Sequence, residues 1–122
     1  MKVAKRTRWV LLVLGAVLVP FGLAAPASAA ASKSCSVRSP TTSCKAGNIR
    51  ANSLHQINYS MCTSASHYTD WQVKDADNGT ILRQGRLQPP FDCASGTISG
   101  LYGQYYGWVF NTRSGASASI WN

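Results

Sequence analysis

The sequence contains no glutamate, and all four of its acidic residues are aspartates. Two of them lie in the stretch DADNG, Asp75 to Gly79, which is similar to the start of a calcium-binding loop. An EF-hand loop needs a further ligand and a glutamate at its end, so the missing glutamate argues against calcium binding. Asn followed by Gly is typical of a tight turn, and we interpret DADNG as a turn.

Helix-forming patterns are also missing. No stretch keeps a 3.6-residue hydrophobic period over three turns, and there is no internal repeat. After the first 29 residues leucine is scarce, whereas Ser, Thr, Gly and Tyr are abundant. This composition opposes helices and suits short strands joined by turns, so we expect an all-β chain.

The signatures of metal binding and catalysis are absent as well. The four cysteines include no Cys-x-x-Cys pair, and His55 and His67 do not lie at ligand spacing beside them. No Gly-x-Ser-x-Gly nucleophile elbow occurs. Asp75 and Asp77 are assigned to the turn, and Asp70 is expected to pair with Arg86. Few titratable groups are therefore left for a catalytic cleft. We therefore predict no catalytic residue, no metal site and no cofactor, and hence a protein that is not an enzyme.

The N-terminus carries an export signal. Four basic residues lie within the first eight, residues 9–25 carry no charge, and Ala27-Ser28-Ala29 has the small-x-small pattern that a signal peptidase accepts. We predict that residues 1–29 are a bacterial secretory signal peptide and that the rest is secreted, extracellular and not inserted in a membrane. A retained membrane anchor is the alternative, but Pro20 interrupts the apolar stretch.

Much of the positive charge belongs to this leader. The full chain has a net charge of +8, and residues 1–29 hold four of the twelve basic residues and no acidic one. The net charge of +4 that remains comes from dispersed Lys and Arg residues rather than from one basic run. This pattern argues against a nucleic-acid partner. It leaves a weak attraction to an anionic cell envelope.

The cysteines predict disulfides. Residues 30–122 suffice for one domain, but chains of this size bury a smaller share of their unfolded surface than larger domains and often need covalent help. In an exported chain, four cysteines indicate two disulfides, with three possible pairings. We favour Cys35–Cys44, a local clip, and Cys62–Cys93, which closes a longer loop. On the loop-entropy model the longer link contributes about 3–4 kcal/mol.

The strand pattern begins at residue 53. Residues 30–52 show no clear alternation, and we predict an irregular N-terminal segment there. Residues 53–122 are predicted to form an antiparallel β-sandwich of about six to seven strands. In the first of these, Ile57, Tyr59 and Met61 point to one face. The expected elements are a strand over 53–62, a hairpin over 68–87, and strands over 96–102, 104–110 and 116–121.

The register of the hairpin can be argued from charge. A two-residue loop, Asn78-Gly79, would place Lys74 opposite Arg83 and divide the apolar residues between two faces. A three-residue loop, Asp77-Asn78-Gly79, avoids this repulsion and pairs Val73 with Arg83. It also gathers apolar residues on one face and requires a left-handed glycine at position 79. The same register pairs Asp70 with Arg86 and places Trp71, Val73, Ile81 and Leu87 together.

The last 23 residues are rich in aromatic side chains. On the strand 104–110, Tyr106, Trp108 and Phe110 share one face, and we interpret this ladder as core packed against the alanines of the last strand. Other rings fall on sides expected to face solvent, and several together would form a surface that grips a ligand. In the loops, Pro89-Pro90 stiffens the path to a phenylalanine. The candidate binding surface consists of Tyr68, Phe91, Tyr105, Arg113 and Trp121.

These features predict a small secreted binding module without catalytic activity. A disulfide-linked β-sandwich is rigid, and rigidity lowers the entropy cost of binding. We expect a monomer that acts by contact with an extracellular protein, in the manner of a proteinaceous inhibitor. Two alternatives stay open: a secreted antimicrobial or toxin-like protein, and a protein that binds cell-wall glycan by stacking rings on sugars.

Overall fold

The computed structural model describes residues 30–122, and the predicted signal peptide lies outside this range. The described chain is all-β and forms two four-stranded antiparallel sheets with two disulfides, which confirms the fold class. Residues 53–122 contain six strands, as expected, and residues 30–52 add two more. They are β1 (Ser32–Ser36), β2 (Cys44–Arg50), β3 (Ile57–Cys62), β4 (Thr69–Asp75), β5 (Ile81–Leu87), β6 (Cys93–Ile98), β7 (Gln104–Phe110) and β8 (Ser117–Trp121).

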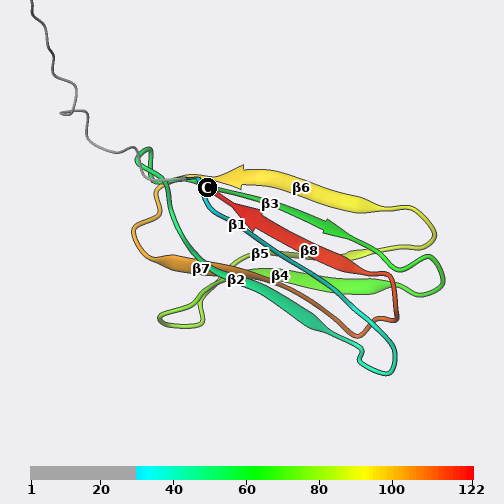
Figure 1. Cartoon of the computed structure of the whole chain (residues 1–122). Coiled ribbons are helices and arrows are strands. Elements are labelled where there is room, and N and C mark those ends of the chain that lie inside the picture. The colour runs from blue at the N-terminus through cyan, green and yellow to red at the C-terminus, as the bar shows by residue number, and fades with distance from the viewer. Residues whose placement is uncertain (1–29) are drawn as a thin grey trace, which may run out of the picture.

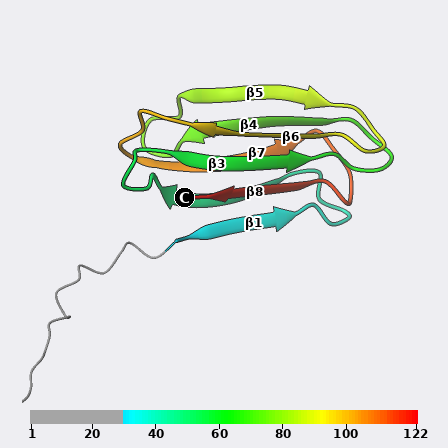
Figure 2. The same cartoon turned by 90° about the horizontal axis from the view of Figure 1, so that it is seen from above.

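The two sheets lie face to face as a sandwich (Figure 1). One sheet has the strand order β1-β8-β3-β6 and the other has the order β2-β7-β4-β5. The strands of the two layers run nearly along one direction, with β5 at one edge and β1 at the opposite edge (Figure 2). Because successive strands alternate in direction, the loops β1–β2, β3–β4, β5–β6 and β7–β8 gather at one end of the sandwich. We call this end the loop end.

The prediction that residues 30–52 are irregular was wrong, because this segment contains β1 and β2. Each is an edge strand, β1 beside β8 and β2 beside β7. The outward positions of β1 are serines, and its inward side offers only Lys33 and Cys35 within the strand. The alternation of β2 is interrupted by a bulge between Gly47 and Ile49. Neither strand therefore shows the apolar period that marks a strand in sequence.

Both disulfides have the expected pairing. Cys35–Cys44 joins β1 of one sheet to β2 of the other and so closes one open edge of the sandwich. Cys62–Cys93 joins directly opposed residues of β3 and β6. Two disulfides in a domain of this size are typical of an oxidising, extracellular-type compartment. Among residues 30–122 there is no helix with the length and apolarity needed to span a membrane.

The hairpin β4–β5 has the expected register. Val73 is opposite Arg83 and Asp70 is opposite Arg86. The two apolar residues of β4, Trp71 and Val73, are buried. Ile81 was expected on the same apolar face, but it is 43% exposed because a bulge shifts the strand beyond Val73.

The turn of this hairpin is one residue longer than expected. The Asp75 amide donates to the Thr80 carbonyl at 2.9 Å, and the Gly79 amide donates to the Asp75 carbonyl at 2.9 Å. The loop is therefore Ala76–Gly79, and the bulge in the ladder absorbs the extra residue. Gly79 adopts the expected left-handed conformation, with φ of 77°.

The core lies between the sheets and contains the alternating residues of β3 and β8. Ile57, Met61 and Ile120 are all fully buried. Tyr59 stacks on Trp71 across the two sheets with ring centroids 5.4 Å apart. The inward sides predicted for these two strands are confirmed.

Strand β7 presents the opposite face to the core from the one expected. Tyr105 and Val109 are buried, whereas Tyr106, Trp108 and Phe110 are partly exposed on the outer side. The missing side chain of Gly107 leaves space on the inner side for Met61 of the other sheet, since an added Cβ would lie only 2.5 Å from the Met61 Cε atom. Pairing with β4 sets this orientation, because Val109 is opposite the inward Trp71.

The strand expected over residues 96–102 begins and ends earlier, at Cys93–Ile98. Its start is set by the pairing of Cys93 with Cys62, and Gly100 turns the chain away after its end with φ of 77°. Leu101 is buried beyond the strand, so its apolar character reflects loop packing rather than strand alternation.

Candidate functional site

The residues predicted as a binding surface do not form one patch. Tyr105 is 4% exposed and belongs to the core, so its assignment to the surface was wrong. Its hydroxyl oxygen accepts hydrogen bonds from the backbone amides of Tyr102 and Gly103, at 3.0 and 2.9 Å. Phe91 is 91% exposed and lies in a loop at the loop end, as does Arg113. Neither lies on the outer face of a sheet.

Trp121 lies on the outer side of the sheet β1-β8-β3-β6 and is 37% exposed. Its neighbours across the strands are Ser32 and Asn58. Most other outward positions of this sheet are small and hydroxylated, and we call this side the serine face. One row of it crosses all four strands in the order Ser34, Ser119, Ser60 and Ser95.

The aromatic residues gather on the outer side of the other sheet. Tyr106, Trp108 and Phe110 occupy successive outward positions of β7, which is a central strand of that sheet (Figure 1). Trp108 and Phe110 stack with centroids 4.1 Å apart and an interplanar angle of 22°. We call this side, with the charged residues around it, the aromatic face.

Cationic side chains from the neighbouring strands lie over these rings. The Lys45 ammonium of β2 is 4.4 Å from the centroid of the Tyr106 ring, and the Lys74 ammonium of β4 is 5.6 Å from that of Trp108. Register places both lysines beside the rings, since Lys45 is directly opposite Trp108 and Lys74 is directly opposite Tyr106, and each ammonium group reaches the ring diagonal to its own position. Cation–π attraction keeps both ammonium groups at the ring surface.

A polar cluster ends the aromatic face near the loop end. Arg86 binds Asp70 with two hydrogen bonds of 2.7 and 3.1 Å, in fork geometry, and its guanidinium lies 4.0 Å from the centroid of the Tyr68 ring. The amide of Asn111 donates to the same carboxylate at 2.9 Å. The hydrogen bond from Arg86 lowers the pKa of Asp70, and burial opposes this shift in part. Tyr68 is thus the one predicted surface residue that joins the aromatic face.

Sequence reasoning missed the three rings of β7 because it assigned them to the core. No signal within β7 could have found them, because the orientation comes from its pairing with β4, which places Val109 opposite the inward Trp71. Within residues 30–122, no group of three His, Cys, Asp or Glu side chains is arranged to hold a metal ion. The aromatic face offers contact area and positive charge, which suits binding.

Comparison of the chain with protein-family models, with curated proteins and with solved structures found no match.

Proposed function

We propose that this protein is a secreted, non-catalytic binding module that acts by contact with an extracellular protein through its aromatic face. The observation that carries the proposal is the ladder of Tyr106, Trp108 and Phe110, which lies on the outer side of a central strand instead of in the core. Trp, Tyr and Arg are the residues that most often dominate the binding energy of protein interfaces. Two disulfides make the sandwich beneath these rings rigid, so that little conformational entropy is lost on binding.

The ring geometry favours a protein over a glycan as the partner. A sugar stacks on an open ring face, but Trp108 and Phe110 cover one another and Lys45 lies over Tyr106. What these rings offer outward is edges and cationic groups, which fit the mixed contacts of a protein interface.

The positive charge of the aromatic face indicates which kind of protein the partner is. The aromatic face holds four cations, Lys45, Arg50, Lys74 and Arg86, and one carboxylate, Asp70. Asp70 is already bound to Arg86, and that is the only ion pair in the described part of the chain. The two lysines are thus available to a partner, and we propose that the partner surface is acidic, since complementary charge steers association.

The proposal is tested by comparing three columns that carry wild-type protein, Trp108→Ala and Ser119→Ala. Ser119 is a matched control because it lies at an outward, partly exposed position of a central strand in the other sheet. Extracellular proteins retained on wild type are identified, and their affinities are then measured in solution. We expect Trp108→Ala to weaken binding by at least about 30-fold and Ser119→Ala to leave it unchanged.

If a partner proves to be a secreted protease or amylase, its inhibition is assayed. Wild-type protein should slow hydrolysis by that enzyme, and Trp108→Ala should not. A protein retained equally on all three columns, or none retained at all, contradicts the proposal. Retention on insoluble chitin, cellulose or peptidoglycan that depends on Trp121 instead supports the glycan alternative. Killing of neighbouring cells without a protein partner supports the toxin alternative.

A further inference from the structure

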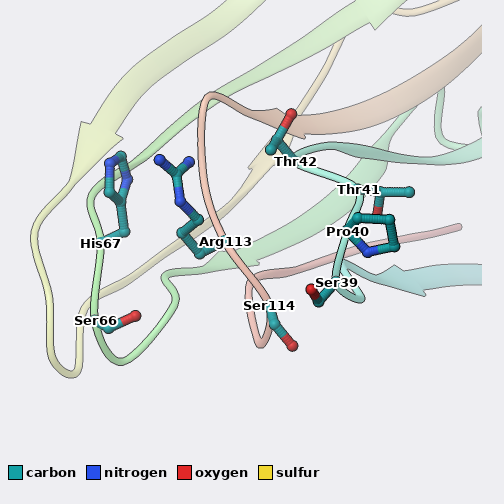
Figure 3. Close-up of a pocket in the computed structure, with 8 residues that line it drawn as sticks. All are labelled: Ser39, Pro40, Thr41, Thr42, Ser66, His67, Arg113 and Ser114. Atoms are coloured by element: carbon teal, nitrogen blue, oxygen red, sulfur yellow. The ribbon is translucent and has the colours of Figure 1, made fainter.

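A second site lies at the loop end, away from the outer faces of the sheets. Three loops, β1–β2, β3–β4 and β7–β8, enclose an open cleft of about 570 Å³ (Figure 3). This volume lies within the range of small-ligand sites. The cleft is lined by hydroxyl groups and by two nitrogen-rich side chains, His67 and Arg113, and its lining includes no carboxylate. The hydroxyl-bearing residues are Ser39, Thr41, Thr42, Ser66 and Ser114.

His67 and Arg113 come from different loops and extend in the same direction in Figure 3. Arg113 donates from Nη1 to the Thr112 carbonyl at 2.8 Å, which orients the guanidinium and leaves its other N–H groups for a ligand. Among residues 30–122 it forms no salt bridge. His67 Nδ1 lies 2.9 Å from the Tyr68 carbonyl oxygen, which only accepts, so Nδ1 donates and Nε2 is left for a ligand.

A chain of buried threonines holds these two loops in place. Thr63 Oγ1 donates to the His67 carbonyl at 3.0 Å and also lies 3.0 Å from Thr69 Oγ1. Thr69 Oγ1 lies 2.7 Å from Thr112 Oγ1, next to Arg113. All three threonines are at most 8% exposed. The Thr112 amide also donates to the Thr42 carbonyl at 3.2 Å, which ties the third loop to the other two.

We propose that this cleft binds a phosphate or sulfate monoester of a small polyol. A guanidinium donates paired hydrogen bonds to such oxyanions. The Thr41 hydroxyl already donates to the Arg38 carbonyl, but the other hydroxyls of the lining can donate to oxygens that point in several directions, as those of a tetrahedral anion do. The cleft is much larger than the anion alone, and the rest of its hydroxylated lining suits the polyol. Because the buried threonines preorganise the loops, little conformational entropy is lost on binding.

The test is a titration of ¹⁵N-labelled, disulfide-bonded protein with glucose 6-phosphate, glucose 6-sulfate, inorganic phosphate and glucose, followed by amide chemical shifts. We expect both esters to shift the amides of residues 39, 41, 42, 66, 67 and 112–114. Inorganic phosphate should bind the same residues more weakly, and glucose should cause no shift. Equal affinity for inorganic phosphate and the esters, or equal shifts with neutral glucose, overturns the proposal.

Variants separate this site from general attraction to a basic protein. Arg113→Gln removes a charged hydrogen-bond donor, and we expect at least about tenfold weaker binding of glucose 6-phosphate. Arg83→Gln is the matched control, since it removes the same charge from an exposed edge strand outside the cleft, and its affinity should stay unchanged. Equal losses in the two variants, with both still folded by their amide spectra, contradict a built anion site. The outcome is independent of the aromatic face.

Discussion

The two outer faces of the sandwich have the same architecture and opposite chemistry. Each is the solvent side of a four-stranded antiparallel sheet with two central strands. The serine face presents a row of small hydroxyls, with Trp121 as its one large ring. The aromatic face presents a ladder of three rings on β7 with two lysines over them.

Comparison of the two faces shows which outward residues the fold requires. The serine face shows that small hydroxylated side chains are enough to cover the outside of a sheet in this sandwich. Rings on the outside of the other sheet are therefore not needed to build it, and their apolar area is held at the surface against the hydrophobic effect. This contrast is the reason to place the proposed binding function on the aromatic face.

The largest expected effect separates the two sides of β7 through the neighbouring residues Tyr105 and Tyr106. Tyr105→Ala removes a buried ring and should lower the free energy of unfolding by about 3–5 kcal/mol, whereas Tyr106→Ala should lower it by less than half as much. Urea unfolding followed by tryptophan fluorescence measures both. Tyr105→Phe keeps the ring but leaves two amides without their acceptor, which should lower stability by about 1–3 kcal/mol. Equal losses for the two alanine variants would mean that the ladder is core.

The next largest effect tests whether the serine face serves stability alone. Cys62 and Cys93 lie on that face and enclose a sequence separation of 31, so replacing both by alanine should lower the free energy of unfolding by about 3–4 kcal/mol. The Cys35–Cys44 pair has a separation of 9 and should contribute about 2.5–3 kcal/mol on the same model.

Partner binding at the aromatic face should be unchanged in the Cys62/Cys93 variant under conditions where it remains folded. Loss of binding in the folded variant would contradict the assignment of stability to the serine face and of binding to the aromatic face. A larger stability loss for the Cys35/Cys44 variant would mean that closing the edge between sheets outweighs loop length.

A smaller effect concerns the charges of the aromatic face. Lys45→Gln with Lys74→Gln should weaken binding of an acidic partner by about fivefold to tenfold, because each lysine provides a modest contribution at an exposed site. The association rate should also become less sensitive to salt, as measured by surface plasmon resonance at two ionic strengths. Lys33→Gln, on β1 of the other sheet, is the control. If Lys33→Gln has the same effect, overall charge and not the aromatic face attracts the partner.

The smallest effect is a pH dependence at the end of the aromatic face. The pKa of Asp70 is lower in the folded protein than its ordinary value because Arg86 donates hydrogen bonds to the carboxylate. A lowered folded pKa adds stability above the unfolded pKa of about 4, and this stability is lost as the pH falls through the folded pKa. Asp70→Asn should therefore be less stable than wild type at neutral pH, and the difference should shrink in acid.

A double-mutant cycle of Asp70→Asn and Arg86→Gln isolates the pair. Urea midpoints should be non-additive at neutral pH and additive once Asp70 is protonated. Coupling that persists unchanged in acid would show that the two residues interact through packing and not through charge.

Several parts of the fold could be predicted because their signals are local. Strand β3 alternates cleanly, and the hairpin register follows from keeping Lys74 and Arg83 apart. The favoured disulfide pairing, one of three that the sequence left open, is the one found. Strands β1 and β2 could not be predicted in this way, because edge strands bury little and a bulge at Gly47 breaks the alternation.

The candidate site was predicted only in part. Tyr68 was assigned to the surface, and the aromatic face includes it. Tyr105 was assigned to the surface and the ladder to the core, whereas the structure has the reverse. Both sides of β7 are apolar, and nothing within its seven residues distinguishes them. The cleft at the loop end includes Arg113, but its threonine support joins three segments that are distant in sequence.

Composition and local pattern were enough to predict an all-β chain, two disulfides, and two strands that present Ile57, Met61 and Ile120 inward. Those features depend on composition and on neighbours within one strand. Which side of β7 faces solvent, and which loops meet around Arg113, was decided only by tertiary structure. The physical reason is that a strand with two apolar sides takes its orientation from the strand beside it, and that pairing is a contact between distant segments.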